Sequence, residues 1–149
     1  MSYLTFAAFF LIVLVAASSG AIFKPGEWYR NLRKPSWTPP DWAFPVAWSV
    51  LYFMIAVAGY LVWMVDPTSP AMVLWVAQLV LNAAWSWLFF GRRDMLTALA
   101  DVMSMWLCIL GFIIAAWPIA PVASLLFVPY LIWVSLASAL NFSVWRLNA

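Results

Sequence analysis

Long apolar segments alternate with short polar breaks along this chain. The breaks contain residues that end helices: Asp66 to Ser69, the tight polar turn Gly91 to Asp94, and the prolines Pro118 and Pro121. A helix needs about 20 apolar residues to cross the hydrocarbon of a bilayer, and each segment is about that long. The pattern therefore predicts an all-α fold, an integral membrane bundle of five transmembrane helices. The expected helices cover about residues 3–22, 42–65, 70–90, 95–117 and 122–145.

The break between the first two helices, residues 23–41, is longer than the others and rich in tryptophan and proline. Pro35, Pro39 and Pro40 prevent a continuous helix there, because proline lacks a backbone donor and restricts the residue before it. Two interpretations stay open. A long, stiff, aromatic loop can be a lid over a binding site. It can equally be an aromatic belt that anchors the protein at the lipid headgroups.

The basic residues predict the orientation. With five spans, loop 23–41, loop 91–94 and the C-terminus lie on one side of the membrane. All seven lysines and arginines fall on that side, which the positive-inside rule assigns to the cytoplasm. We therefore expect the N-terminus outside and the loop and C-terminus inside. The basic residues are Lys24, Arg30, Arg33, Lys34, Arg92, Arg93 and Arg146.

The composition supports a multi-pass membrane protein with a single domain over residues 1–149. Hydrophobic residues make up 68% of the chain and charged residues 8%, against about 25% charged in soluble domains. The net charge of +2 is too small to suggest nucleic acid as a partner. The chain has no histidine and one cysteine, Cys108, so metal sites built on these residues and Ser-His-Asp triads are excluded. We expect no metal site and no required cofactor.

Five positions on four helices, most of them polar or aromatic, occur at one depth. Counted from the basic side at 1.5 Å per residue, they lie roughly 7 to 14 Å into the bundle, beneath loop 23–41. Polar groups inside a span should face protein or a cavity rather than lipid. The arrangement is what a pocket in that leaflet needs. The five residues are Trp48, Asn82, Asp101, Ala137 and Asn141.

Residues on three helix faces lie at about this depth. Each face carries aromatic residues at helical spacing, and two of the faces include an amide, although such stripes also serve plain interhelical packing. Their coincidence at matched depth favours a cavity for a flat apolar ligand. The stripes are Trp48 and Tyr52; Gln78, Asn82, Trp85 and Phe89; and Trp133, Ala137 and Asn141, with Tyr130 beside them.

Asp101 is the one acidic side chain well inside a span. A carboxylate there costs about 2.5–3.5 kcal/mol on insertion scales, so it should be protonated or paired. The candidate partners are Arg92, Arg93, a tryptophan N–H or a residue of the loop. A proton-coupled mechanism needs a second relay group, which favours a structural clasp.

Several motifs resemble the TspO/MBR family (translocator protein, peripheral benzodiazepine receptor). They occur in order over essentially the whole chain, and the tryptophan- and proline-rich loop motif is the most specific of them. They are WY at 28–29, KPSWTPPDW at 34–42, PVAWSVLY at 45–52, QL with Asn82 at 78–82, Trp85 with FFG at 89–91, PYLIW at 129–133, and LNF with WR at 140–146.

This resemblance implies a five-helix membrane protein, usually a homodimer, that binds porphyrins such as protoporphyrin IX and haem. Sterols and synthetic benzodiazepine or isoquinoline ligands are further ligands of the family. The ligand is expected in a pocket under the first loop, where the protein would sense, sequester or transport it. The predicted ligand-binding set combines the residues that match the family motifs with those indicated by depth and helical spacing. It consists of Tyr29, Trp37, Trp48, Tyr52, Asn82, Trp85, Phe89, Asp101, Trp133, Ala137 and Asn141.

Two alternative functions are also considered. Some bacterial relatives promote light-dependent breakdown of protoporphyrin IX, which here would assign Trp48 and Trp133 as catalytic electron donors. A proton-coupled drug-efflux pump is disfavoured because the first helix carries no carboxylate.

The chain departs from the family in its sterol-recognition pattern. Phe142 occupies the position of the central tyrosine before Arg146, so membrane lipid is an expected partner but sterol is weakly supported. Because histidine is absent, free-base porphyrin is a better expected ligand than haem.

Overall fold

The computed structural model describes residues 2–149, and the described residues form helices and no strands. The all-α prediction with five membrane-spanning helices is confirmed, since five helices are long and apolar enough to span a membrane. A short sixth helix lies within the first loop. The elements are α1 (Ser2–Ile22), α2 (Gly26–Arg30), α3 (Ala43–Val65), α4 (Pro70–Ser86) with its continuation η1 (Trp87–Gly91), α5 (Met95–Ala116) and α6 (Pro121–Asn148).

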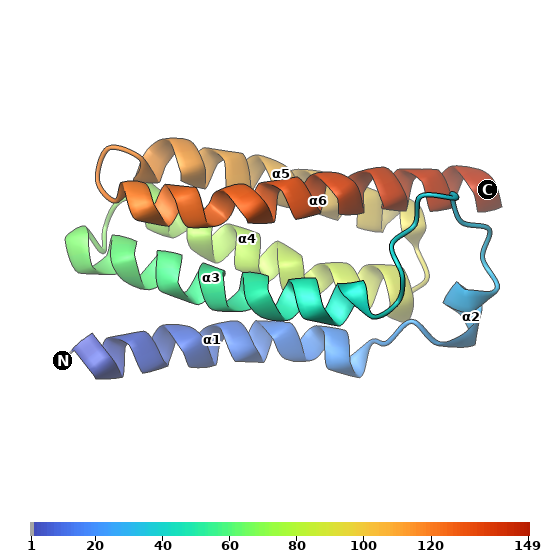
Figure 1. Cartoon of the computed structure of the whole chain (residues 1–149), viewed down its shortest axis with the longest axis horizontal. Helices are drawn as coiled ribbons and strands as arrows, with labels where there is room; N and C mark the ends of the chain where they lie inside the picture. Colours follow the sequence, from blue (N-terminus) through green and yellow to red (C-terminus); the bar gives the residue numbers. More distant parts are fainter. Residues whose placement is uncertain (1) are drawn as a thin grey trace.

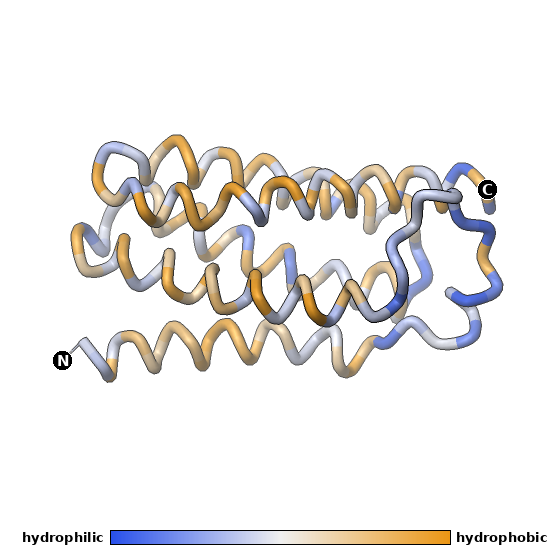
Figure 2. Tube along the Cα trace, in the orientation of Figure 1, coloured by the Kyte–Doolittle hydropathy of each residue, from blue (hydrophilic) through white to orange (hydrophobic). Residues whose placement is uncertain are grey.

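The five long helices lie side by side, with α2 and the rest of the first loop at the end that carries the C-terminus (Figure 1). Contacts run from α1 to α3, from α3 to α6, from α6 to α5, from α5 to α4 and from α4 back to α1. The bundle is therefore a closed ring in which α3 and α4 also meet. Figure 2 shows mostly hydrophobic helices and a hydrophilic end at the first loop and C-terminus, which we call the basic end.

Two helix ends differ from the sequence prediction. The third span was expected as one helix over 70–90, but its last turn widens into η1, where the Arg92 amide donates to the Trp87 carbonyl (2.7 Å). Such π-turns are common at functional sites. The fifth span continues to Asn148 instead of ending near residue 145. The Asn148 side chain stabilises this extra turn, because it donates to the Val144 carbonyl (2.8 Å).

A glycine lets α3 and α4 approach closely. The Trp75 indole lies against Gly59 and donates its Nε1–H to the Ile55 carbonyl (2.9 Å). A Cβ on Gly59 would lie 2.5 Å from Cε2 of Trp75, which is buried and cannot move aside. Small residues commonly permit such contacts between membrane helices.

We predict that Gly59→Ala destabilises the bundle by about 1–3 kcal/mol, the usual cost of overpacking a core. Gly20→Ala is the matched control, because its Cβ would meet only Ser86 Oγ at 3.8 Å. The control should be neutral or stabilising by up to about 1 kcal/mol through helix propensity. Thermal unfolding in detergent compares them, and equal melting temperatures for the two variants would contradict the packing argument.

The start of α5 is capped by Asp94. Its carboxylate accepts hydrogen bonds from the Thr97 amide (3.1 Å) and the Thr97 hydroxyl (2.7 Å). These bonds, followed by the nearby Arg92 charge, hold the pKa of Asp94 below its ordinary value despite some desolvation. The cap satisfies one of the free amides at the helix start.

Asp94→Ala should lower the melting temperature at neutral pH. Because the folded pKa is depressed, the contribution of the ionised cap is present above the unfolded pKa of about 3.9 and is lost as the pH falls through the folded value. The gap between wild type and variant should therefore shrink in acid. A gap that stays constant from neutral pH into acid would show that the charge is irrelevant.

Candidate functional site

The first loop is docked on the basic end of the bundle. In this loop, the Tyr29 ring contacts Phe89 and Phe90 edge-on, at centroid distances of 6.1 and 5.5 Å, and Trp28 contacts Phe89 at 5.8 Å. Lys34 Nζ lies over the Tyr29 ring, 4.5 Å from its centroid. Burial, and secondarily Asp41, raises the pKa of Tyr29, so its hydroxyl is neutral at physiological pH.

The loop is also joined to the end of α6. The Arg33 amide donates to Asn148 Oδ1 (2.9 Å), and Asn148 Nδ2 donates to the Arg33 carbonyl (2.8 Å). One side chain thus pairs with both backbone groups of a loop residue. This docking favours the lid interpretation. Trp37 and Trp42 are nonetheless exposed, as an aromatic belt requires, so the loop has features of both interpretations.

Beneath the loop, aromatic rings from α3 and α6 form a continuous wall. Trp48 stacks on Tyr52 at 5.5 Å and meets the Trp133 ring edge-on at 6.3 Å. Tyr130 contacts Trp48 at 6.3 Å, and Phe44 contacts Trp133 at 5.6 Å. The structure therefore brings together the three predicted residues of this wall, Trp48, Tyr52 and Trp133.

A chain of hydrogen bonds runs behind this wall through the interior. The Tyr52 hydroxyl donates to Asn82 Oδ1 (3.1 Å), and Asn82 Nδ2 donates to the Tyr130 hydroxyl (2.8 Å). The Tyr130 hydroxyl donates to Gln78 Oε1 (2.7 Å), and Gln78 Nε2 donates to the Trp75 carbonyl (2.7 Å). All donors point the same way, and such chains strengthen each bond by polarisation. We call Tyr52, Asn82, Tyr130 and Gln78 the polar chain.

The second predicted amide, Asn141, also bonds to protein. Trp85 Nε1 donates to Asn141 Oδ1 (3.0 Å), and Asn141 Nδ2 donates to the Met95 carbonyl (2.9 Å) at the start of α5. Trp85 stacks on Phe89 at 5.1 Å, which joins this group to the docked loop. Asn141 therefore ties α4, α5 and α6 together, and both its amide oxygen and its amide nitrogen are bonded to protein.

Three buried polar atoms beneath the loop have no hydrogen-bond partner among the described residues: Trp133 Nε1, Asp101 Oδ2 and Ser138 Oγ. Pairing of Asp101 with an arginine is not seen, because Arg92 lies over the Trp87 ring and Arg93 over the Trp28 ring. Unpartnered buried polar atoms are rare in native proteins and often mark a place for a water molecule or a ligand.

The remaining predicted residues are Trp37 and Ala137. Trp37 lines a groove on the outside of α6, and Ala137 packs, partly buried, against the core. Sequence reasoning left Phe44 out of the site, although it contacts Trp133, and did not identify Tyr130 as the centre of the polar chain. The position of Tyr130 three residues before Trp133 was the available signal.

Tyr130→Phe should destabilise the protein more than Tyr52→Phe. The first change removes two buried hydrogen bonds and leaves Asn82 Nδ2 and Gln78 Oε1 unpaired, at about 1–3 kcal/mol for each unsatisfied group. The second removes one bond of a half-buried phenol, worth about 0.5–1.5 kcal/mol. Thermal unfolding in detergent measures both, and equal losses would show that the chain is not centred on Tyr130.

Comparison with known proteins identifies the family of the chain. A sequence model described as the TspO/MBR family matches residues 7–146. The tryptophan-rich sensory protein of Cereibacter sphaeroides is 46% identical, over 95% of this chain and 92% of its own length. Protein CrtK of Rhodobacter capsulatus is 41% identical over 99% and 95%, and the human translocator protein 39% identical over 87% and 81%. The predicted resemblance is confirmed: this chain belongs to the TspO/MBR family of multi-pass membrane proteins.

Proposed function

We propose that this protein binds a tetrapyrrole, with protoporphyrin IX as the preferred ligand, between α3 and α6 beneath the docked loop. The wall of Phe44, Trp48 and Trp133 supports this proposal, because flat apolar ligands bind where aromatic faces and a few polar groups converge. The names of two relatives, tryptophan-rich sensory protein and translocator protein, agree with sensing or transport as the purpose of binding.

The observation that carries the proposal is the indole nitrogen of Trp133. Its N–H is buried in the aromatic wall and unpartnered, whereas Asn82 and Asn141 have their hydrogen bonds with protein. A carboxylate of the ligand would accept this hydrogen bond. A bond to a charged acceptor contributes about 1.5–3 kcal/mol, which is enough to orient a ligand.

Ligand entry would require movement. The rings of Trp48, Tyr52 and Trp133 contact each other, and the loop above them is held by aromatic contacts and the Asn148 pair. Rings and loop must therefore separate for a tetrapyrrole to enter. Loops of this kind gate access in many binding proteins.

Haem is the weaker candidate because no histidine is available as an axial ligand. We further propose that the basic end faces the cytoplasm, as the positive-inside rule indicates, so the loop would receive ligand from that side. A homodimer is the assembly that we expect.

The test is a titration of the purified protein with protoporphyrin IX, followed by quenching of tryptophan fluorescence. Wild type should bind at micromolar ligand. Trp133→Phe keeps an aromatic ring but loses the N–H, and should bind roughly 10- to 100-fold more weakly, the effect of losing one charge-assisted bond. Trp117→Phe is the control, because Trp117 is exposed beyond the far end of α5. Absence of quenching and of any spectral shift in wild type would refute the proposal.

A second function is light-dependent porphyrin breakdown. The Trp48 and Trp133 rings lie 6.3 Å apart in the proposed site, where either indole could donate an electron to an excited porphyrin. Illumination of the complex distinguishes the two functions. Loss of the porphyrin absorbance that disappears in Trp133→Phe supports breakdown, whereas stable absorbance in wild type supports binding alone.

A further inference from the structure

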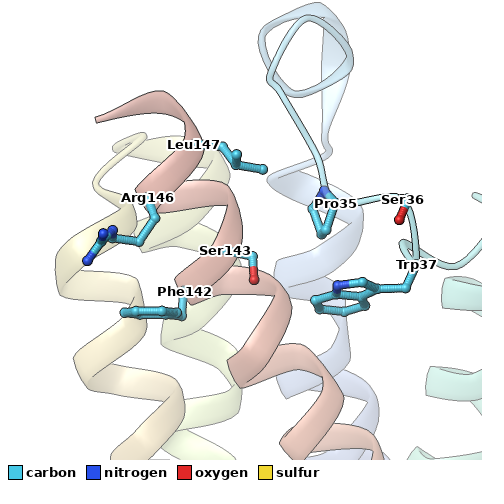
Figure 3. Close-up of a pocket in the computed structure, with 7 residues that line it drawn as sticks. All are labelled: Pro35, Ser36, Trp37, Phe142, Ser143, Arg146 and Leu147. Carbon is cyan, nitrogen blue, oxygen red and sulfur yellow. The ribbon is translucent and has the colours of Figure 1, made fainter.

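A separate groove of about 560 Å³ lies outside the bundle, between the loop and the last turns of α6. Pro35, Ser36 and Trp37 form its loop side. Figure 3 shows Ser143 and Leu147 of α6 facing this side, while Phe142 and Arg146 extend from the adjoining side of the same helix. Its volume is within the range of small-molecule sites, about 300–1,000 Å³.

The groove combines exposed apolar surface with one cation. Trp37 and Phe142 are each 46% exposed and Leu147 is 44% exposed. Arg146 is the charged residue of the lining, which contains no acidic side chain, and its guanidinium lies 5.9 Å from the Phe142 ring. The site therefore offers apolar contact and positive charge together at the basic end of the bundle.

We infer that an anionic phospholipid of the surrounding membrane occupies this groove, with its phosphate on Arg146 and its acyl chains against Trp37, Phe142 and Leu147. Arginine forms bidentate hydrogen bonds with phosphate. A neutral sterol is a poorer occupant, because Phe142 has no hydroxyl for a sterol alcohol and the arginine charge would be unused. Basic residues at the membrane surface attract anionic lipids.

The occupant would also act on the loop. Residues 35–37 form one side of the groove, and Arg33, two residues earlier, is the residue paired with Asn148 at the end of α6. A lipid that touches both sides holds the loop against α6. Anionic lipid should therefore stabilise the docked loop, whatever ligand binds beneath it.

The experiment uses full-length protein in nanodiscs of phosphatidylcholine alone or mixed with phosphatidylglycerol. Native mass spectrometry measures retained phosphatidylglycerol, and hydrogen–deuterium exchange measures protection of residues 31–38. Wild type should retain the anionic lipid and show a more protected loop in its presence. Arg146→Gln should lose about fivefold in retention, the factor expected for one basic residue, together with the lipid-dependent protection.

Arg92→Gln is the matched control, because Arg92 is an exposed cation at the same end whose side chain lies over Trp87 and does not line the groove. It should retain lipid like wild type. Arg146→Lys keeps the charge and should retain most binding, which separates loss of charge from misfolding. The inference would be overturned if Arg146→Gln retained as much phosphatidylglycerol as wild type, or if Arg92→Gln lost as much of it as Arg146→Gln. It would also be overturned if cholesterol or free glycerol phosphate gave the loop the same protection.

Discussion

Polar groups buried in an apolar bundle must find partners, and the polar chain shows how this protein meets that requirement. Tyr52, Asn82, Tyr130 and Gln78 connect α3, α4 and α6 through hydrogen bonds that all run in one direction. In hydrocarbon, water cannot replace a lost partner, so these residues specify which faces of the three helices meet. The ring of helices and the position of the aromatic wall both depend on this connection.

The same requirement divides the predicted site into two kinds of residue. Asn82 and Asn141 resemble ligand-binding amides by depth and spacing, but their side chains bond Tyr130 and Trp85 and hold helices together. The polar atom left free in the aromatic wall is Trp133 Nε1. Recognition of a ligand would therefore fall to an indole and to ring faces, with the amides as the rigid support behind them.

The loop completes this arrangement through contacts of moderate strength. The Tyr29 and Trp28 rings of the loop contact Phe89. The backbone of Arg33 in the loop bonds to the Asn148 side chain at the end of α6. Aromatic contacts and exposed hydrogen bonds each contribute about 1 kcal/mol, so the docked loop can open without disturbing the bundle. Rigid helices with a separable cover would suit the proposed binding of a tetrapyrrole.

By itself, the sequence determined the five spans, the basic end and the aromatic level beneath the loop, because hydropathy, charge and helical spacing are properties of each segment alone. It also placed Trp48, Tyr52 and Trp133 on faces that meet. Only the tertiary structure decided that Asn82 and Asn141 are bonded by protein, that Trp37 lines an outer groove, and that α6 extends to Asn148. Hydrogen-bond partners lie on other helices, up to 115 residues away for Asn148 and Arg33, and no local pattern specifies which of them a side chain reaches.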